Sequence, residues 1–267
     1  MELPLYQVDA FASALFRGNP AAICPLERWI PDQAMQAIAA ENNLAETAYY
    51  VPQSGRYGLR WFTPAVEVDL CGHATLAAAS VILDIRREIA GPLVVFDTKS
   101  GELAVERTRE NGRDLYALDF PARPPVPCSA DPRVEAALGA KPASILAGHG
   151  YCCVFDTEEQ VRKLRPDMAG LASLDRPMLM ATAPGTDCDF VSRFFAPAKG
   201  IPEDPVTGSA HTTLIPYWAS RLGKKRMFAR QISARGGELW CEDRGPRVRI
   251  AGRAVKYLEG RIEIPCN

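Results

Sequence analysis

Acidic, thiol and imidazole side chains lie beside two glycines, each of which opens an apolar helical run. Gly72 opens GHATLAAASVIL and Gly208 opens GSAHTTLIPYWASRL. A glycine at this position lets the N–H groups of the first helical turn point outward, and together with the helix dipole these groups bind carboxylate or phosphate. The alternative is that each glycine only permits a tight turn. The two segments therefore predict anion binding at helix N-termini.

Three residues near Gly72 are candidates for acid/base chemistry. Glu46 lies in NNLAETAYY, at the start of an expected strand, where burial would raise its pKa toward that of a useful general base. Cys71 precedes the helix start, a position that favours a thiolate, and His73 follows it. The structural alternatives are a solvated carboxylate, an inert buried cysteine and a capping or packing histidine.

Two polar residues flank the second glycine in DPVTGS. Asp204 is placed to accept hydrogen bonds from exposed amides of the helix turn, and Ser209 is placed to cap the helix or to contact a ligand. A purely structural role for the pair stays open. His211, one turn into the second helix, is expected to pack or to face solvent, and nothing in the sequence connects His149 with the other candidates.

An internal repeat indicates how these residues are positioned. The segment RWFTPA recurs as RFFAPA about half a chain later, and each copy is followed by an acidic stretch and a glycine-led helix. The spacing is ten residues from Phe62 to Gly72 and thirteen from Phe195 to Gly208, so the second copy carries a three-residue insertion. The repeat predicts a duplicated chain.

The pattern of elements predicts the fold class. Short β-branched and aromatic runs, among them YCCVFDT, DFVSRFF and RQISARG, predict strands, and segments 32–42 and 158–165 are expected to be helical. The proline-rich stretch 120–128 predicts a linker. We therefore expect an α/β (α+β) protein with two pseudo-symmetric domains, 1–122 and 128–267, whose last strand is able to return to the first half. Each domain is expected to be a curled, mostly antiparallel sheet or barrel around a central helix, and two such halves facing each other would point both helix N-termini into one cleft.

Composition and charge argue against several classes of protein. The net charge is −1 and the arginines are scattered among acidic residues, so no footprint for nucleic acid is present. The sequence contains no unbroken run of about 18 apolar residues, so no membrane span is predicted. The first twenty residues do not resemble a signal peptide, so the eight cysteines are expected to be free thiols in the cytoplasm. Without Cys-x-x-Cys or His-x-x-x-His spacing, no metal site is expected.

Four stretches carry a resemblance to a known family: FRGNPAAIC (16–24), NNLAETAYY (42–50), RWFTPAVEVDLCGHATLAAA (60–79) and PEDPVTGSAH (202–211). They resemble the PhzF-like family of phenazine-biosynthesis-related proteins, which have the diaminopimelate-epimerase fold, and the pattern of strands extends the resemblance over essentially the whole chain. The family's named reaction is isomerisation of a dihydroxyanthranilate-type ring acid through a proton shift. The resemblance implies a small carboxylic-acid substrate, no cofactor and a homodimer.

The resemblance also implies roles for individual residues. Glu46 matches the family's general acid/base. His73, Asp204 and Ser209 match residues that line the same pocket. Cys71 and Asn19 are possible accessory residues, Asn19 because it lies in the matched stretch FRGNPAAIC.

A comparison with the epimerases and racemases of this fold limits the mechanism. These enzymes use two cysteines, one per half, as opposed acid and base. Cys71 matches the first position, but the aligned stretch 204–208 contains no cysteine, which disfavours two-thiol stereoinversion. The leading prediction is a cofactor-independent isomerase in which one carboxylate moves a proton. The alternatives are an amino-acid epimerase or racemase using Cys71 with Glu46 or Asp204, and a non-catalytic small-acid binding protein.

Overall fold

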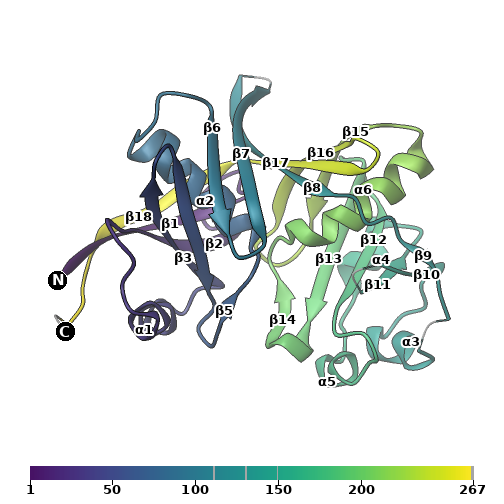
Figure 1. Ribbon diagram of the computed structural model, residues 1–267. Helices are drawn as coiled ribbons and strands as arrows, with labels where there is room; N and C mark the ends of the chain where they lie inside the picture. The colour runs from purple at the N-terminus through teal and green to yellow at the C-terminus, as the bar shows by residue number, and fades with distance from the viewer. Residues whose placement is uncertain (111, 130, 149, 266–267) are drawn as a thin grey trace. The chain divides into compact units, whose positions relative to one another are not determined.

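The computed structural model describes residues 1–110, 112–129, 131–148 and 150–265. The chain divides into two compact units, and each is a mixed α/β structure made mostly of sheet (Figure 1). Unit 1 comprises residues 1–119 and 251–267, and unit 2 comprises residues 120–250.

Unit 1 consists of strands arranged around one central helix. Its strands are β1 (Glu2–Ala10), β2 (Asn19–Pro25), β3 (Glu46–Gln53), β4 (Arg56–Phe62), β5 (Glu67–Val68), β6 (Leu93–Thr98), β7 (Gly101–Glu110), most of β8 (Arg113–Pro121) and β18 (Ala254–Glu263). Its helices are α1 (Asp32–Asn42) and α2 (Gly72–Ser80), and α2 continues into the π-helical turn η1 (Val81–Ile85).

Helix α2 is central because it is apolar on every side. Its sequence, GHATLAAAS, offers no polar face, and every residue from His73 to Ser80 is buried. A helix of this kind is stable only when it is covered all round. It packs against β1, β2, β3 and β7, which fixes the position of its N-terminal residues in unit 1.

Unit 2 repeats this plan with a longer central helix. Its strands are β9 (Val126–Pro127), β10 (Ser144–Ala147), β11 (Tyr151–Val154), β12 (Leu179–Pro184), β13 (Phe190–Ala196), β14 (Ile201–Asp204), β15 (Arg226–Gln231), β16 (Gly237–Asp243) and most of β17 (Arg247–Gly252). Its helices are α3 (Arg133–Leu138), α4 (Glu158–Lys163), α5 (Met168–Ala172), the 3₁₀ turn η2 (Pro197–Lys199) and α6 (Gly208–Leu222). The aliphatic and aromatic side chains of α3, α4, α5, β11, β12 and β13 form a hydrophobic cluster.

The two units have the same strand pairing. In unit 1, β2 lies parallel to β3, β3 antiparallel to β4, β4 antiparallel to β5 and parallel to β6, and β6 antiparallel to β7. In unit 2, β11 lies parallel to β12, β12 antiparallel to β13, β13 antiparallel to β14 and parallel to β15, and β15 antiparallel to β16. The expected pseudo-symmetric pair of α/β domains is confirmed, and in neither unit do the described strands form a closed barrel.

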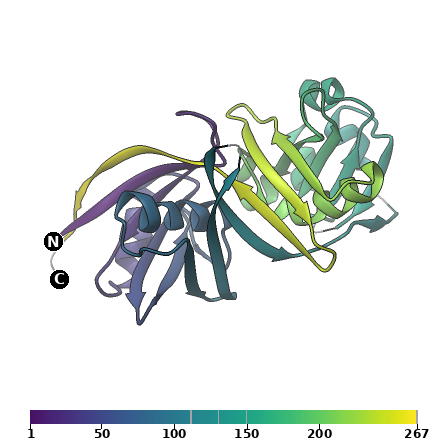
Figure 2. The same ribbon diagram turned by 90° about the horizontal axis from the view of Figure 1, so that it is seen from above.

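The last strand of the chain belongs to unit 1. Strand β18 runs antiparallel to β1 along its length, and Figure 2 shows the two side by side. In unit 2 the short strand β9 pairs antiparallel with β10 in the same way. Val126 and Pro127, which form β9, lie inside the segment expected to be a linker, so part of that segment contributes to the sheet of unit 2.

The same side-chain contacts hold the turn before each central helix. The Ser100 hydroxyl donates to the carbonyl oxygen of Asp69 at 2.7 Å in unit 1. In unit 2 the Ser233 hydroxyl donates to the carbonyl oxygen of Pro205 at 2.8 Å. Each serine lies two residues beyond the strand that runs parallel to β4 or β13. The duplication therefore extends from the strand order to individual hydrogen bonds.

One strand predicted from the sequence ends earlier along the chain than expected. The segment RQISARG was expected to be a strand, but β15 ends at Gln231. The chain turns after that residue because the Ser233 side chain bonds to Pro205 and Gly236 adopts a left-handed φ of 68°. The helix predicted at 32–42 is confirmed, and the one predicted at 158–165 ends at Lys163. Within the described residues, no helix has the length and apolarity that crossing a membrane requires.

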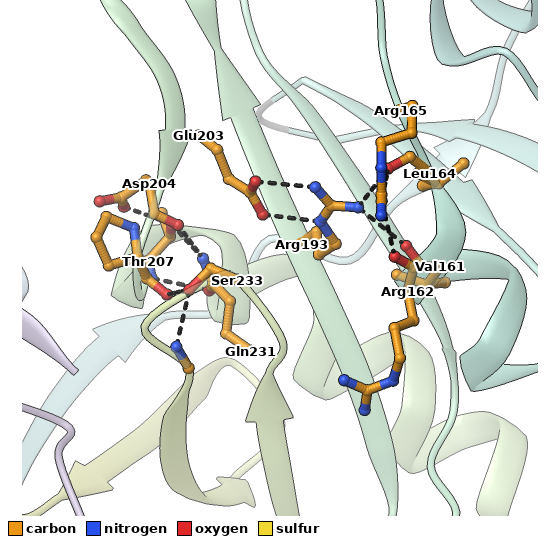
Figure 3. Close-up of polar contacts among 12 residues, drawn as sticks. Val161, Arg162, Leu164, Arg165, Arg193, Glu203, Asp204, Thr207, Gln231 and Ser233 are labelled. Atoms are coloured by element: carbon orange, nitrogen blue, oxygen red, sulfur yellow. Dashed lines mark hydrogen bonds and ion pairs between the residues drawn. The ribbon is translucent and has the colours of Figure 1, made fainter. Parts of the chain in front are cut away.

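A bidentate ion pair in each unit fixes the strand that leads to the central helix. Arg193 donates to both carboxylate oxygens of Glu203 at 2.8 and 2.9 Å (Figure 3). Its guanidinium lies over the ring of Phe195. Arg60 donates to Glu67 in the same way, at 2.7 and 2.9 Å. Each arginine lies in a repeated segment and each glutamate in the acidic stretch that follows it. The repeat therefore reflects a structural contact that both units make.

We expect Arg193→Met to lower the free energy of unfolding by about 3 kcal/mol, because it leaves the Glu203 carboxylate without its partner in a mostly buried position. Urea unfolding followed by circular dichroism would measure the change. Lys163→Met, which breaks an exposed ion pair with Glu159, is the control and should have a much smaller effect. Equal effects of the two substitutions would contradict a structural role for the buried pair.

Candidate active site

Four predicted site residues of unit 1 lie at the ends of neighbouring elements. Asn19 begins β2 and Glu46 begins β3, and these strands lie parallel and adjacent. Cys71 immediately precedes α2, and His73 lies in its first turn. Because α2 packs against both strands, the four side chains are brought together at one end of the central helix.

His73 is the centre of this group. Its Nε2 lies 3.0 Å from Oε2 of Glu46, and its Nδ1 lies 3.5 Å from Sγ of Cys71. The amide nitrogen of Asn19 is 3.3 Å from the same Nδ1. When Nδ1 of His73 carries a proton, the Asn19 amide is favoured in the flipped orientation, in which its oxygen faces Nδ1 and accepts the hydrogen bond. Both ring nitrogens therefore lie beside a polar side chain, although Nε2 and Oε2 of Glu46 are at ion-pair distance without the angles of a hydrogen bond. His73 is buried, with 7% of its surface exposed.

The expectation of a raised pKa for Glu46 was wrong. Burial raises the pKa of Glu46, but the charge and hydrogen bond of His73, with a smaller contribution from Cys71, lower it below the ordinary value of 4.5. For His73, burial lowers the pKa, but Cys71 and Glu46 together raise it well above 6.5. A carboxylate therefore faces an imidazolium at neutral pH.

The expectation of a favoured thiolate at Cys71 was also wrong. Burial raises the pKa of this thiol above 9.0, and the negative charge of Glu46 raises it further. His73 and the backbone N–H of Ala74 oppose this increase but do not overcome it. At neutral pH Cys71 is therefore a protonated thiol, able to donate a hydrogen bond but poor as a base.

The same three side chains have the chemical types of a metal site. One ligand atom from each of Glu46, Cys71 and His73 lies within 4.8 Å of the others. However, Cys71 contacts Nδ1 of His73 and Glu46 contacts Nε2. A single ion binds one imidazole nitrogen and would lie on one side of the ring. The described geometry therefore fits a proton-transfer site better than a three-ligand metal site.

The predicted residues of unit 2 lie together at the start of α6. Asp204 ends β14, Thr207 precedes the helix, and Gly208 and Ser209 are its first two residues. The Thr207 hydroxyl lies 2.5 Å from Oδ2 of Asp204. Gly208 does not have a left-handed φ, and an added Cβ there would meet no atom within 4 Å, so the turn itself does not require glycine. The same holds for the φ of Gly72.

Gln231, which the sequence did not single out, is fully buried and bound to the loop before α6 (Figure 3). Its Oε1 accepts the N–H of Thr207 at 2.9 Å, and its Nε2 donates to the carbonyl of Asp204 at 2.7 Å and to the hydroxyl of Thr207 at 3.1 Å. Gln231 is 24 residues from Thr207 in the chain. A contact between residues so far apart leaves no local pattern in the sequence.

His211 was expected either to pack or to face solvent, and the structure shows that it packs. It is fully buried, its ring lies against Phe190, and its Nδ1 donates to the carbonyl of Thr207 at 2.8 Å. Burial lowers its pKa to about 4, so it is neutral at physiological pH. His149 lies outside the described residues. The expectation that the groups at α2 and α6 line one cleft stays a prediction.

The strand registers identify which residues of unit 2 take the places of the acid/base group. Thr47 pairs with Phe62, and Leu179 pairs with Phe195, so the residue before Leu179, Met178, corresponds to Glu46. Counted from the helix starts at Gly72 and Gly208, Thr207 corresponds to Cys71 and Ser209 to His73. Unit 2 therefore has a thioether and two hydroxyls where unit 1 has a carboxylate, a thiol and an imidazole.

We expect His73 to stay protonated at pH values well above 6.5, because the negative charge of Glu46 favours the imidazolium. NMR titration of the histidine ring signals would measure this, and Glu46→Gln should move the pKa of His73 down. His211 is the matched control, since burial lowers its pKa to about 4 and its hydrogen bond to the Thr207 carbonyl opposes this shift only in part. A His73 that titrates near 6.5 in both proteins would contradict the ion pair.

The pair also makes stability depend on pH. The lowered pKa of Glu46 contributes stability above 4.5 that is lost as the pH falls through the folded value. The raised pKa of His73 contributes stability below 6.5 that is lost as the pH rises through its folded value. The difference in unfolding free energy between the wild type and Glu46→Gln should therefore be largest between pH 4.5 and 6.5.

Comparison with known proteins places the chain in a family. The family model described as phenazine biosynthesis-like protein matches residues 8–260. A protein of Pseudomonas aeruginosa named an uncharacterized isomerase is 51% identical, over 99% of this chain and 100% of that protein. The crystal structure of a PhzF-family phenazine biosynthesis protein from Enterococcus faecalis superposes with a TM-score of 0.95 and 46% identity, over 99% of this chain and 100% of that one.

The fold extends to more distant proteins. A hydroxyproline epimerase from Agrobacterium vitis shares the fold with a TM-score of 0.60 and 11% identity, over 98% of this chain and 92% of that one. Because the family model covers nearly all of the sequence and the relatives match it end to end, the chain belongs to the phenazine biosynthesis-like (PhzF) family.

Proposed function

We propose that the protein is a cofactor-independent isomerase that shifts a proton on a small carboxylate-bearing substrate, with Glu46 as the group that removes and returns the proton. The observation that carries the proposal is the buried pair of Glu46 and His73, a carboxylate held ionised in a mostly apolar setting. Relatives named isomerases support the reaction class.

Glu46 is suited to act first as a base. Its lowered pKa keeps it ionised at neutral pH, so it is ready to accept a proton. A carboxylate is a weak base, and the carbon that it deprotonates must be acidified by conjugation with an electron-withdrawing group. This requirement favours an unsaturated or ring acid as substrate.

His73 then favours the return of the proton. Once Glu46 is neutral, the imidazolium beside it stabilises the ionised form and so promotes transfer of the proton back to the substrate. Return to a different carbon completes the isomerisation, with one C–H bond broken, one formed and no net gain or loss of electrons. The Cys71 thiol, protonated because burial raises its pKa, helps only to orient the imidazole.

Unit 2 is proposed to bind the substrate rather than to react with it. The N–H groups at the start of α6, beginning at Gly208, are suited to a carboxylate, and the dipole of this 15-residue helix favours a negative charge there. Asp204 and Ser209 add polar contacts beside this turn. None of the residues that correspond to Glu46, Cys71 and His73 ionises in the neutral range, so unit 2 supplies no second acid/base group at those positions.

The alternatives from the sequence are weakened by the same observations. An epimerase using Cys71 with Glu46 needs an acid and a base on opposite faces of the carbon, whereas both side chains lie around the same imidazole. One using Cys71 as the base with Asp204 needs an available thiolate, whereas burial and the charge of Glu46 keep this thiol protonated. A non-catalytic binding protein would keep a carboxylate at Glu46 that repels the acid it binds. Deuterium at an inverted α-carbon would support the epimerase, and tight binding without exchange would support the binding protein.

We expect Glu46→Gln to slow proton exchange by at least about 100-fold, because the amide has the size of the carboxylate but cannot accept the proton. Small carboxylic acids would be screened by NMR in deuterated buffer for incorporation of solvent deuterium. Binding of the acid that exchanges should change much less than the rate.

Cys71→Ala is the matched comparison in the same cluster, and its effect on exchange should be weaker. Exchange that is unchanged in Glu46→Gln would remove Glu46 from the mechanism. A loss in Cys71→Ala as large as that in Glu46→Gln would restore the thiol mechanism.

A further inference from the structure

The loop that precedes α6 is held by more hydrogen bonds than the corresponding loop before α2. Three contacts occur in unit 2 from the single side chain of Gln231, two to Thr207 and one to the carbonyl of Asp204. They add to the serine contact that both units share.

The counterpart of Gln231 in unit 1 is Thr98. Gly58 pairs with Asp97 in the parallel ladder of β4 and β6, as Val191 pairs with Arg230 in the ladder of β13 and β15, so the next residues, Thr98 and Gln231, correspond. Thr98 uses its hydroxyl inside its own turn, donating to Gly101 and accepting from Ser100.

Among the described hydrogen bonds, none joins Thr98 to Cys71. The loop therefore folds without this contact in unit 1. Gln231 is an addition in unit 2, and it is not needed for the turn as such.

The hydrogen bonds of Gln231 fix the direction of the Thr207 hydroxyl. Because Nε2 of Gln231 donates to Oγ1 of Thr207, that oxygen accepts on one side and its own hydrogen points toward Oδ2 of Asp204. The carboxylate of Asp204 is thereby held as an acceptor. The hydrogen bond from Nε2 of Gln231 to the carbonyl oxygen of Asp204 fixes the backbone at Asp204.

We propose that Gln231 is a positioning residue for substrate binding, which sets Asp204 and the first turn of α6 through Thr207. This inference rests on the proposed role of unit 2 in binding the substrate. Gln231 does not itself contact the substrate. Its burial and its three bonds to one short loop make it a rigid support for the groups that do.

The test uses anthranilate, a ring acid with a carboxylate and an amino donor, as the probe. Its dissociation constant would be measured with the whole protein from the ¹H–¹⁵N signals of Gly208 and Ser209. Gln231→Leu removes all three hydrogen bonds, and we expect it to weaken anthranilate binding at least about tenfold. Thr98→Val, at the corresponding place in unit 1, should leave the affinity within about twofold.

Gln231→Glu separates positioning from simple loss of folding. An introduced carboxyl in this buried place is partly protonated at lower pH, where it donates one hydrogen bond, and ionised at higher pH, where it only accepts. The ratio of its anthranilate affinity to that of the wild type should fall from about pH 6 to about pH 8. The nearby His211 stays neutral in this range, its pKa being about 4, and Asp204 is common to both proteins.

Two results would overturn the inference. One is wild-type affinity for anthranilate in Gln231→Leu while hydrogen exchange at the Thr207 amide is faster, since the contacts would then only stabilise the loop. The other is no saturable shift at Gly208 and Ser209 in the wild type. Neither depends on turnover, so failure of the acid/base proposal, seen as unchanged exchange in Glu46→Gln, is distinguished from failure of this one.

Discussion

The buried contact between Glu46 and His73 is the constraint on which unit 1 depends. Two charges taken out of water lose several kcal/mol of hydration each, and only close, well-supported contact compensates for this loss. The start of β3 and the first turn of α2 must therefore lie close enough for Oε2 of Glu46 and Nε2 of His73 to be 3.0 Å apart. Cys71 and Asn19 supply the remaining contacts to the imidazole, so the mostly apolar helix α2 begins at a small, buried polar cluster.

The duplicated fold separates the features that both units share from those that occur in one unit. Both units have the same strand pairing and the same serine contact before the central helix. A side chain four residues along also donates to the carbonyl of the capping residue in each, from Thr75 in one unit and His211 in the other. Features present twice are explained by folding. Within the described part of the chain, the carboxylate–imidazole pair and the Gln231 contacts each occur in one unit, so the shared fold alone does not explain them.

Much of this organisation was predictable from the sequence, and the misses have physical causes. The repeated Arg-aromatic segments indicated the duplication because each arginine forms the same ion pair in its own unit. The predicted pKa shifts of Glu46 and Cys71 had the wrong direction. Burial was expected to raise the pKa of Glu46, but His73 lowers it. The helix start was expected to lower the pKa of Cys71, but burial raises it. Gln231 was missed because its partners belong to a different segment of the chain.

The loss of symmetry between the units has a stereochemical consequence. Inversion at a carbon requires a proton donor and a proton acceptor on opposite faces, whereas a shift along one face requires only one group that does both. At the place that corresponds to Cys71, the Thr207 hydroxyl already donates toward Asp204 and accepts from Gln231. Its hydrogen is already donated to Asp204, so this hydroxyl is a poor proton donor to a substrate carbon. In the proposed reaction, a proton removed by Glu46 would therefore be returned by the same carboxylate, and the product would retain the face from which the proton was taken.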